Sequence, residues 1–156
     1  MPFIHNHIIQ QAATVTAGAA GQTAITSDVV DTANCDGVLF IVSFGAITTG
    51  AVTSIKVQQC DTSGGSYADL EGTSQTVADD ADNTTFYVDV FRPREQFLKL
   101  VVSRATQNAT VGSILAIKYN ASNRPTTQGA GVTGGETFNG PAEGTASWPD
   151  STIDSA

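Results

Sequence analysis

Two histidines near the start of the chain are the first residues whose spacing could support metal chemistry. His5 and His7 flank Asn6, and side chains two residues apart on an extended strand point to the same face. A protein metal site needs a third and usually a fourth ligand, yet the sequence contains only these two histidines. We therefore expect an ordered terminal segment at this position and no metal site.

A second group of metal-type ligands is the acidic run from Asp79 to Asn83, in which Asp79, Asp80 and Asp82 supply carboxylates. Carboxylate oxygens are the ligands that Ca²⁺ prefers, and the spacing is similar to the start of a calcium loop. The run lacks the glycine and the closing glutamate of such loops. Asp and Asn also accept hydrogen bonds from backbone amides in turns. The sequence leaves both interpretations open and favours a solvated hairpin loop at Asp79–Asp82.

Residues for nucleophilic or acid–base catalysis are present without the spacing that catalysis needs. No Gly-x-Ser-x-Gly sequence occurs, and Cys60 has no basic side chain next to it in the sequence. Asp69 and Glu71 could mimic a glycosidase pair, but exposed acids beside a turn are far commoner. Cys35 and Cys60 lack C-x-x-C spacing, so we expect two buried free thiols. We predict that the protein is not an enzyme and uses no cofactor.

Charge and hydropathy exclude two further classes of partner. The chain of 156 residues has a net charge of −8, and all seven Lys and Arg residues lie between positions 56 and 124. No basic stripe is available to neutralise phosphates, so we expect no nucleic-acid binding. The chain begins without the basic and apolar regions of a secretory signal. The longest apolar run, Val38–Val42, is too short to span a membrane.

The elements that must position these residues are short strands. Alternating or continuous apolar patterns, separated by turn residues and without helical periods, predict strands at Thr23–Val30, Gly37–Phe44, Val52–Gln59, Ser66–Leu70, Gln75–Ala78, Thr84–Phe91, Phe97–Arg104 and Val111–Tyr119. Gly37–Phe44 is apolar enough to be buried on both faces. Asp61–Gly65 has the composition of a hairpin turn, with two glycines that are free to take positive φ. This pattern predicts an all-β fold, an antiparallel β-sandwich or jelly-roll-like domain.

The predicted sandwich occupies residues 22–120, between an N-terminal arm (1–21) and an extended, Gly-rich C-terminal tail (121–156). Both flanking segments carry large apolar side chains in otherwise small or polar surroundings. Such side chains are typical of segments that bind another chain. The predicted partner contacts are Phe3, Ile4, Ile8, Ile9, Phe138 and Trp148.

Residues 37–119 resemble the small β-sandwich decoration (cement) proteins of tailed bacteriophages. The resemblance rests on a strand that ends in a Q-x-C-D turn at Gln58–Asp61, on a G-x-Y-x-D return at Gly65–Asp69, and on an R-P-x-x-x-x-L-K-L entry at Arg92–Leu100. The N-terminal arm and the acidic C-terminal tail lie outside it.

The resemblance implies a structural virion protein that binds the outer surface of an icosahedral phage capsid and bridges neighbouring capsomers. It implies the major capsid protein as partner, a homotrimer or another homo-oligomer, and assembly in the bacterial cytoplasm. Two alternatives remain open from the sequence. One is a structural protein of the virion tail or neck, and the other is a carbohydrate-binding β-sandwich module, which would present exposed aromatic side chains.

Overall fold

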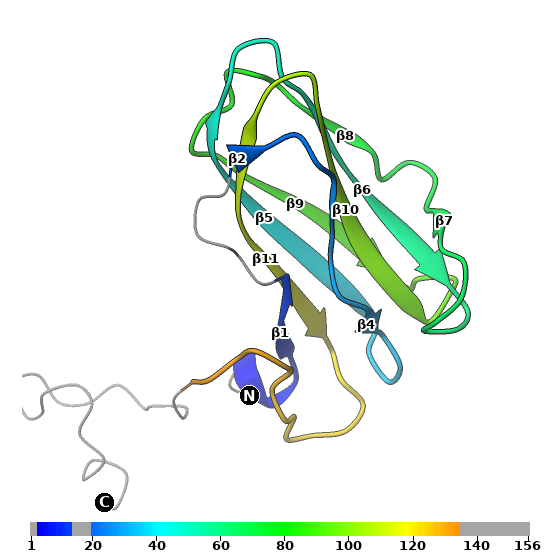
Figure 1. Ribbon diagram of the computed structural model, residues 1–156. Helices are drawn as coiled ribbons and strands as arrows, with labels where there is room; N and C mark the ends of the chain where they lie inside the picture. The colour runs from blue at the N-terminus through cyan, green and yellow to red at the C-terminus, as the bar shows by residue number, and fades with distance from the viewer. Residues whose placement is uncertain (1–2, 14–19, 135–156) are drawn as a thin grey trace, which may run out of the picture.

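The computed structural model describes residues 3–13 and 20–134, which form a two-layer antiparallel β-sandwich (Figure 1). A short 3₁₀ helix, η1 (Phe3–His5), precedes the first strand. The five-stranded sheet, called sheet A, has the order β1-β11-β5-β9, with β2 beside β11. The six-stranded sheet, called sheet B, has the order β3-β10-β6-β7, with β4 beside β10 and β8 beside β6. The all-β sandwich predicted from the sequence is confirmed.

Every strand pair in both sheets is antiparallel. The strands of sheet A are β1 (Ile8–Ala13), β2 (Ala20–Gly21), β5 (Gly37–Ile47), β9 (Thr85–Phe91) and β11 (Ala109–Tyr119). The strands of sheet B are β3 (Ile25–Thr26), β4 (Val30–Asp31), β6 (Val52–Cys60), β7 (Ala68–Asp69), β8 (Gln75–Val77) and β10 (Phe97–Ala105). Among the described residues, no helix is long and apolar enough to cross a membrane.

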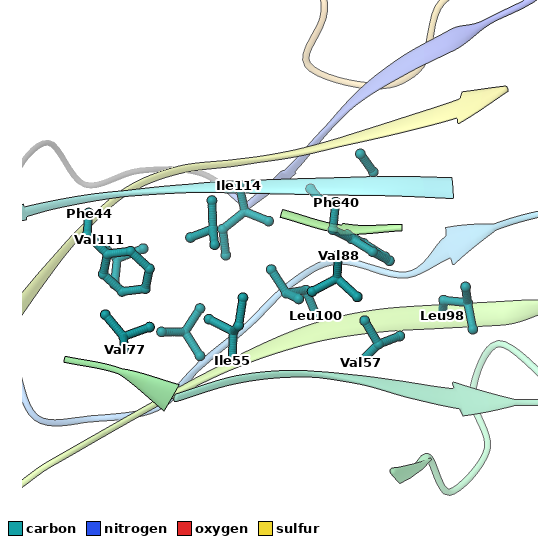
Figure 2. Close-up of a cluster of buried hydrophobic side chains, with 14 of the residues drawn as sticks. Phe40, Phe44, Ile55, Val57, Val77, Val88, Leu98, Leu100, Val111 and Ile114 are labelled. Carbon is teal, nitrogen blue, oxygen red and sulfur yellow. The ribbon is translucent and has the colours of Figure 1, made fainter. Parts of the chain in front are cut away.

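The hydrophobic core lies between the two sheets, as Figure 2 shows. Side chains from sheet A meet side chains from sheet B, and most are fully enclosed. The largest of them are Phe40 and Ile114 from sheet A, and Ile55, Leu98 and Leu100 from sheet B. Burying side chains of this size contributes about 1.5–3 kcal/mol each relative to exposure. This shared core fixes which face of every long strand points inward.

β5 differs from the expectation that both of its faces are buried. Val38, Phe40 and Val42 are completely buried, whereas Leu39 and Ile41 on the other face are only half-buried. In a two-layer sandwich only one face of a sheet meets the opposite sheet. The outer half of the apolar run in β5 therefore has no layer of this chain covering it among the described residues.

The segment expected to be an N-terminal arm contributes a strand to sheet A. β1 pairs with β11, and residues beyond β11 run along the other side of β1, where the amide of Gly129 donates to the carbonyl of Ile9 (2.9 Å). The side chain of Thr126 donates to the carbonyl of Ile4 (2.6 Å). Figure 1 shows the orange segment after β11 passing beside the blue β1. The sandwich therefore extends beyond the expected limits of 22 and 120.

The Asp61–Gly65 loop is a hairpin, as predicted, because it joins the antiparallel strands β6 and β7. Neither of its glycines takes positive φ, since the positive-φ glycines of the described chain are Gly50, Gly72 and Gly131. Gly65 is needed for space instead. A Cβ atom there would lie 2.5 Å from the Sγ atom of Cys60 and would overlap the hydroxyl of Thr62.

Candidate functional site

The residues singled out for metal chemistry serve local structure. The ring of His7 stacks on Phe3 with the ring centroids 4.1 Å apart, and its Nδ1 atom lies 2.9 Å from the carbonyl oxygen of Phe3. Within residues 3–13 and 20–134, no group of three or more His, Cys, Asp or Glu side chains could hold a metal ion.

The acidic run Asp79–Asn83, which connects β8 of sheet B to β9 of sheet A, holds the turn between β5 and β6. The amide of Ile47 donates to Asp82 and the amide of Gly50 donates to Asp79, both over 2.6 Å. These two carboxylates therefore satisfy backbone donors of a neighbouring turn, as expected of Asp residues in a loop. The expectation of a hairpin is wrong, because β8 and β9, which flank the acidic run, belong to different sheets.

The candidate nucleophile, Cys60, and the candidate acid, Asp69, also take part in local structural contacts. The thiol of Cys60 is buried under its own hairpin, 3.7 Å from a carboxylate oxygen of Asp61. The carboxylate of Asp69 accepts from Lys56 (2.7 Å) and Gln58 (2.8 Å), and the Lys56 hydrogen bond lowers the pKa of Asp69. A carboxyl group held ionised in this way is a poor proton donor. Cys35 is half-buried, and burial raises the pKa of its thiol.

The outer face of sheet B is polar. It presents Ser54, Lys56 and Gln58 of β6 beside Lys99 and Ser103 of β10, which are their cross-strand partners or diagonal neighbours. The ammonium of Lys99 lies over the ring of Tyr67, 4.1 Å from its centroid. This is the ordinary solvent-facing side of an antiparallel sheet.

The outer face of sheet A is apolar over the same area. In one row across the sheet, Ile9 pairs with Ile117, which pairs with Leu39. In the next row, Leu115 pairs with Ile41, which pairs with Tyr87. Each row ends in a polar residue, Asp89 beside Leu39 and Gln11 beside Leu115. We call this surface the apolar face; its members are Ile9, Leu39, Ile41, Tyr87, Phe91, Leu115 and Ile117. The inner-facing neighbours of these residues fill the core, so all seven side chains point away from sheet B.

Two aromatic side chains project from one margin of the apolar face. Tyr87 and Phe91 lie on β9, the edge strand of sheet A, and are 66% and 59% exposed. The guanidinium of Arg92 lies 5.0 Å from the centroid of the Phe91 ring. Asp89 lies between these two rings on the same face of β9. Exposed aromatic side chains beside an apolar sheet face mark interaction sites in soluble proteins.

Tyr119 closes one end of the apolar face by crossing a strand. Its hydroxyl reaches from β11 over Gly37 of β5 and donates to the carboxylate of Asp89 on β9 (2.8 Å). Burial, together with the hydrogen bond and the negative charge of Asp89, raises the pKa of Tyr119. Only a glycine at position 37 leaves room for this crossing.

The predicted contact residues lie in different places. Ile9 belongs to the apolar face, whereas Ile8 points to the opposite side of β1 and lines a hollow with Pro125 and Thr126. Phe3 is 52% exposed, and Ile4 is half-buried. Phe138 and Trp148 lie outside the described residues.

Most of the apolar face was not among the residues selected from the sequence. The available signal was the continuity of the apolar runs in β5 and β11. A strand that is apolar on both faces needs a covering layer on each side, and a two-layer sandwich supplies only one. Once a fold of two layers is known, the second apolar face of β5 and of β11 is predicted to be uncovered. The residues on these uncovered faces are Leu39, Ile41, Leu115 and Ile117.

Comparison with known proteins gives limited information. No protein-family model matches the sequence, and no curated protein matches it. A solved structure of infectious bursal disease virus, Gt strain, is similar over 76% of this chain, with 14% sequence identity and a TM-score of 0.46. The matched region spans 33% of the viral chain, about a third of its length. The function therefore has to be inferred from the surface of the molecule.

Proposed function

We propose that this protein is a structural, non-catalytic virion component that attaches to the outer surface of an icosahedral phage capsid and bridges neighbouring capsomers. The observation that carries the proposal is the difference between the two outer faces. Sheet B presents mainly serine, glutamine and lysine, with Val52 exposed at one end of β6, whereas sheet A presents leucine, isoleucine, tyrosine and phenylalanine over several neighbouring strands. An outer sheet face of a free-standing sandwich is usually polar. A sandwich with one apolar outer face is suited to assembly with other protein.

The exposed aromatic pair, Tyr87 and Phe91, allows the free energy gained by covering the apolar face to be calculated. A large aromatic side chain buries about 150–250 Å², and Tyr87 and Phe91 still expose 66% and 59% of theirs. At about 25 cal/mol per Å², covering them contributes about 2–4 kcal/mol each before the costs of association. Covering this face with a neighbouring protein of the assembly is therefore favourable, and contacts repeated over a symmetric shell strengthen attachment through avidity.

The sequence resemblance supports the same role. The region that resembles phage decoration proteins, residues 37–119, contains β5 to β11 and therefore most of both sheets. It also contains six of the seven members of the apolar face. Binding only to the assembled shell would stabilise that shell by mass action.

The direct test is sedimentation with capsids assembled without the protein. We expect the purified chain to pellet with expanded shells and to saturate at a fixed number of copies per capsomer. Tyr87→Asp/Phe91→Asp should pellet more weakly. Val52→Asp is the matched control, because Val52 is 62% exposed but lies on sheet B. A wild-type protein that stays in the supernatant beside intact shells would contradict the proposal.

One observation also favours a carbohydrate-binding module. Tyr87 and Phe91 project from the same strand face, about 13 Å apart at the rise of a β-strand, and exposed aromatics bind sugar rings. A glycan array separates the two functions. Binding to a defined glycan, lost in Tyr87→Ala and kept in Val52→Ala, would favour the carbohydrate module over the virion role.

A further inference from the structure

We infer that a second copy of this chain covers the apolar face, with two A sheets stacked face to face about a two-fold axis that runs along the strands. This inference deepens the proposed assembly role and rests on it. A pair joined through its apolar faces would present its remaining outer surface to the shell twice, which is what bridging neighbouring capsomers requires, and loss of pairing would therefore also weaken attachment.

The side chains of the apolar face differ in height across the sheet, and this arrangement is complementary to a second copy of the same face. Across sheet A, the side chains of β1, β11 and β5 are half-buried aliphatics, whereas those of β9 are the exposed rings of Tyr87 and Phe91. A two-fold rotation about an axis along the strands reverses the strand order in the second sheet. The rings on β9 of one copy then lie over the aliphatic surface of β1 and β11 in the other. The same contact is made twice, as in an isologous interface.

The size of the face is close to what a stable pair needs. The four main strands, about 4.8 Å apart, give a width of about 19 Å. β5 contains 11 residues, which corresponds to a length of about 36 Å at about 3.3 Å per residue. β1 has only 6 residues and β9 only 7, so the footprint of the four strands is about 550 Å². Counted over both partners this exceeds the roughly 1,000 Å² that a specific interface needs, although it is smaller than a standard interface of about 800 Å² per partner.

Charge opposes pairing of two copies in general and opposes it least at the apolar face. The chain carries a net charge of −8, so two copies repel each other wherever their carboxylates meet. Within the paired rows of the apolar face, the described carboxylate is Asp89, which already accepts the hydrogen bond of Tyr119. The aliphatic rows have no charge to match with a basic partner, and long-range repulsion between copies falls with salt.

The test is the mass of the full chain in solution, measured by sedimentation velocity over rising concentration up to roughly 100 µM, a range that detects micromolar affinity. We expect a species of twice the chain mass of 16.1 kDa, with tighter pairing at higher salt. Tyr87→Asp/Phe91→Asp should sediment as one chain, and Val52→Asp should pair like the wild type. A wild-type mass of one or three chains throughout would overturn the inference, as would a pair that Tyr87→Asp/Phe91→Asp leaves intact.

A second variant guards against loss of folding. Ile41→Thr keeps a β-branched side chain at the centre of the apolar face, and we expect it to weaken pairing at least tenfold while the circular dichroism spectrum stays unchanged. Pairing of equal strength in Ile41→Thr would count against the sheet-to-sheet contact. A wild-type chain that is single in solution yet pellets with capsids would refute this inference and leave the proposed function standing. A chain that pairs through the apolar face but does not bind capsids would refute the proposed function and leave the pairing inference standing.

Discussion

Replacing Gly37 with alanine should be among the most damaging single-methyl changes in this protein. A Cβ atom at this position would overlap the hydroxyl of Tyr119 and would lie 2.5 Å from the carbonyl oxygen of Val90. The tyrosine side chain can swing aside, but the Val90 carbonyl belongs to the backbone of the neighbouring strand. Overpacking of this kind costs about 1–3 kcal/mol. Displacing Tyr119 also removes its hydrogen bond to Asp89, worth about 1 kcal/mol at a partly exposed site.

The expected total is therefore about 2–4 kcal/mol, or a fall of about 10 °C in the thermal unfolding midpoint for a chain of this length. Differential scanning calorimetry of Gly37→Ala measures it. Gly64→Ala is the matched control, because no atom lies within 4 Å of the position of its Cβ, and it should leave the midpoint nearly unchanged or slightly raised. Tyr119→Phe should cost about 1 kcal/mol alone and much less in the Gly37→Ala background. Equal midpoints for the two alanine variants would refute the steric reasoning.

Three further predictions concern stability. The raised pKa of Tyr119 means that the folded state holds this proton more tightly than the unfolded state, so its contribution is complete below pH 10 and declines at higher pH; alkaline unfolding curves should fall less steeply for Tyr119→Phe than for the wild type. Asp82→Ala should lower the free energy of unfolding by about 1 kcal/mol, because the Ile47 amide loses its acceptor, whereas urea titration of Asp80→Ala should match the wild type. Truncation after residue 134 should preserve the unfolding midpoint, and truncation after residue 124 should lower it, because residues 126–130 bond to η1 and β1; equal midpoints would contradict that attachment.

The strands that could be predicted from the sequence are those whose side chains alternate against a single core. In β6 and β9 the pattern identified both the strand and its inward face, since Ile55, Val57, Val88 and Val90 are all buried. β1 was not predicted, because its sequence IIQQAA neither alternates nor contains turn residues at its ends. Its place is set by pairing with β11, a contact that local pattern does not encode.

The candidate site was only partly predictable for a related reason. Ile9 was predicted to be a contact residue because it is a large apolar residue in the N-terminal segment, but the six other members of the apolar face, on β5, β9 and β11, come from distant parts of the sequence. They share one surface only after the cross-strand register is known. A shift of one residue in that register would have turned the same side chains into the core.

Cryo-electron microscopy of capsids that carry the bound protein would show what covers the apolar face in the assembled particle. The account predicts that the apolar face is covered in the assembled particle, with density from a second copy of the chain lying over Leu39, Ile41 and Leu115 of the first. A map in which the protein is attached to the shell while the outer face of sheet A stays open to solvent would contradict it.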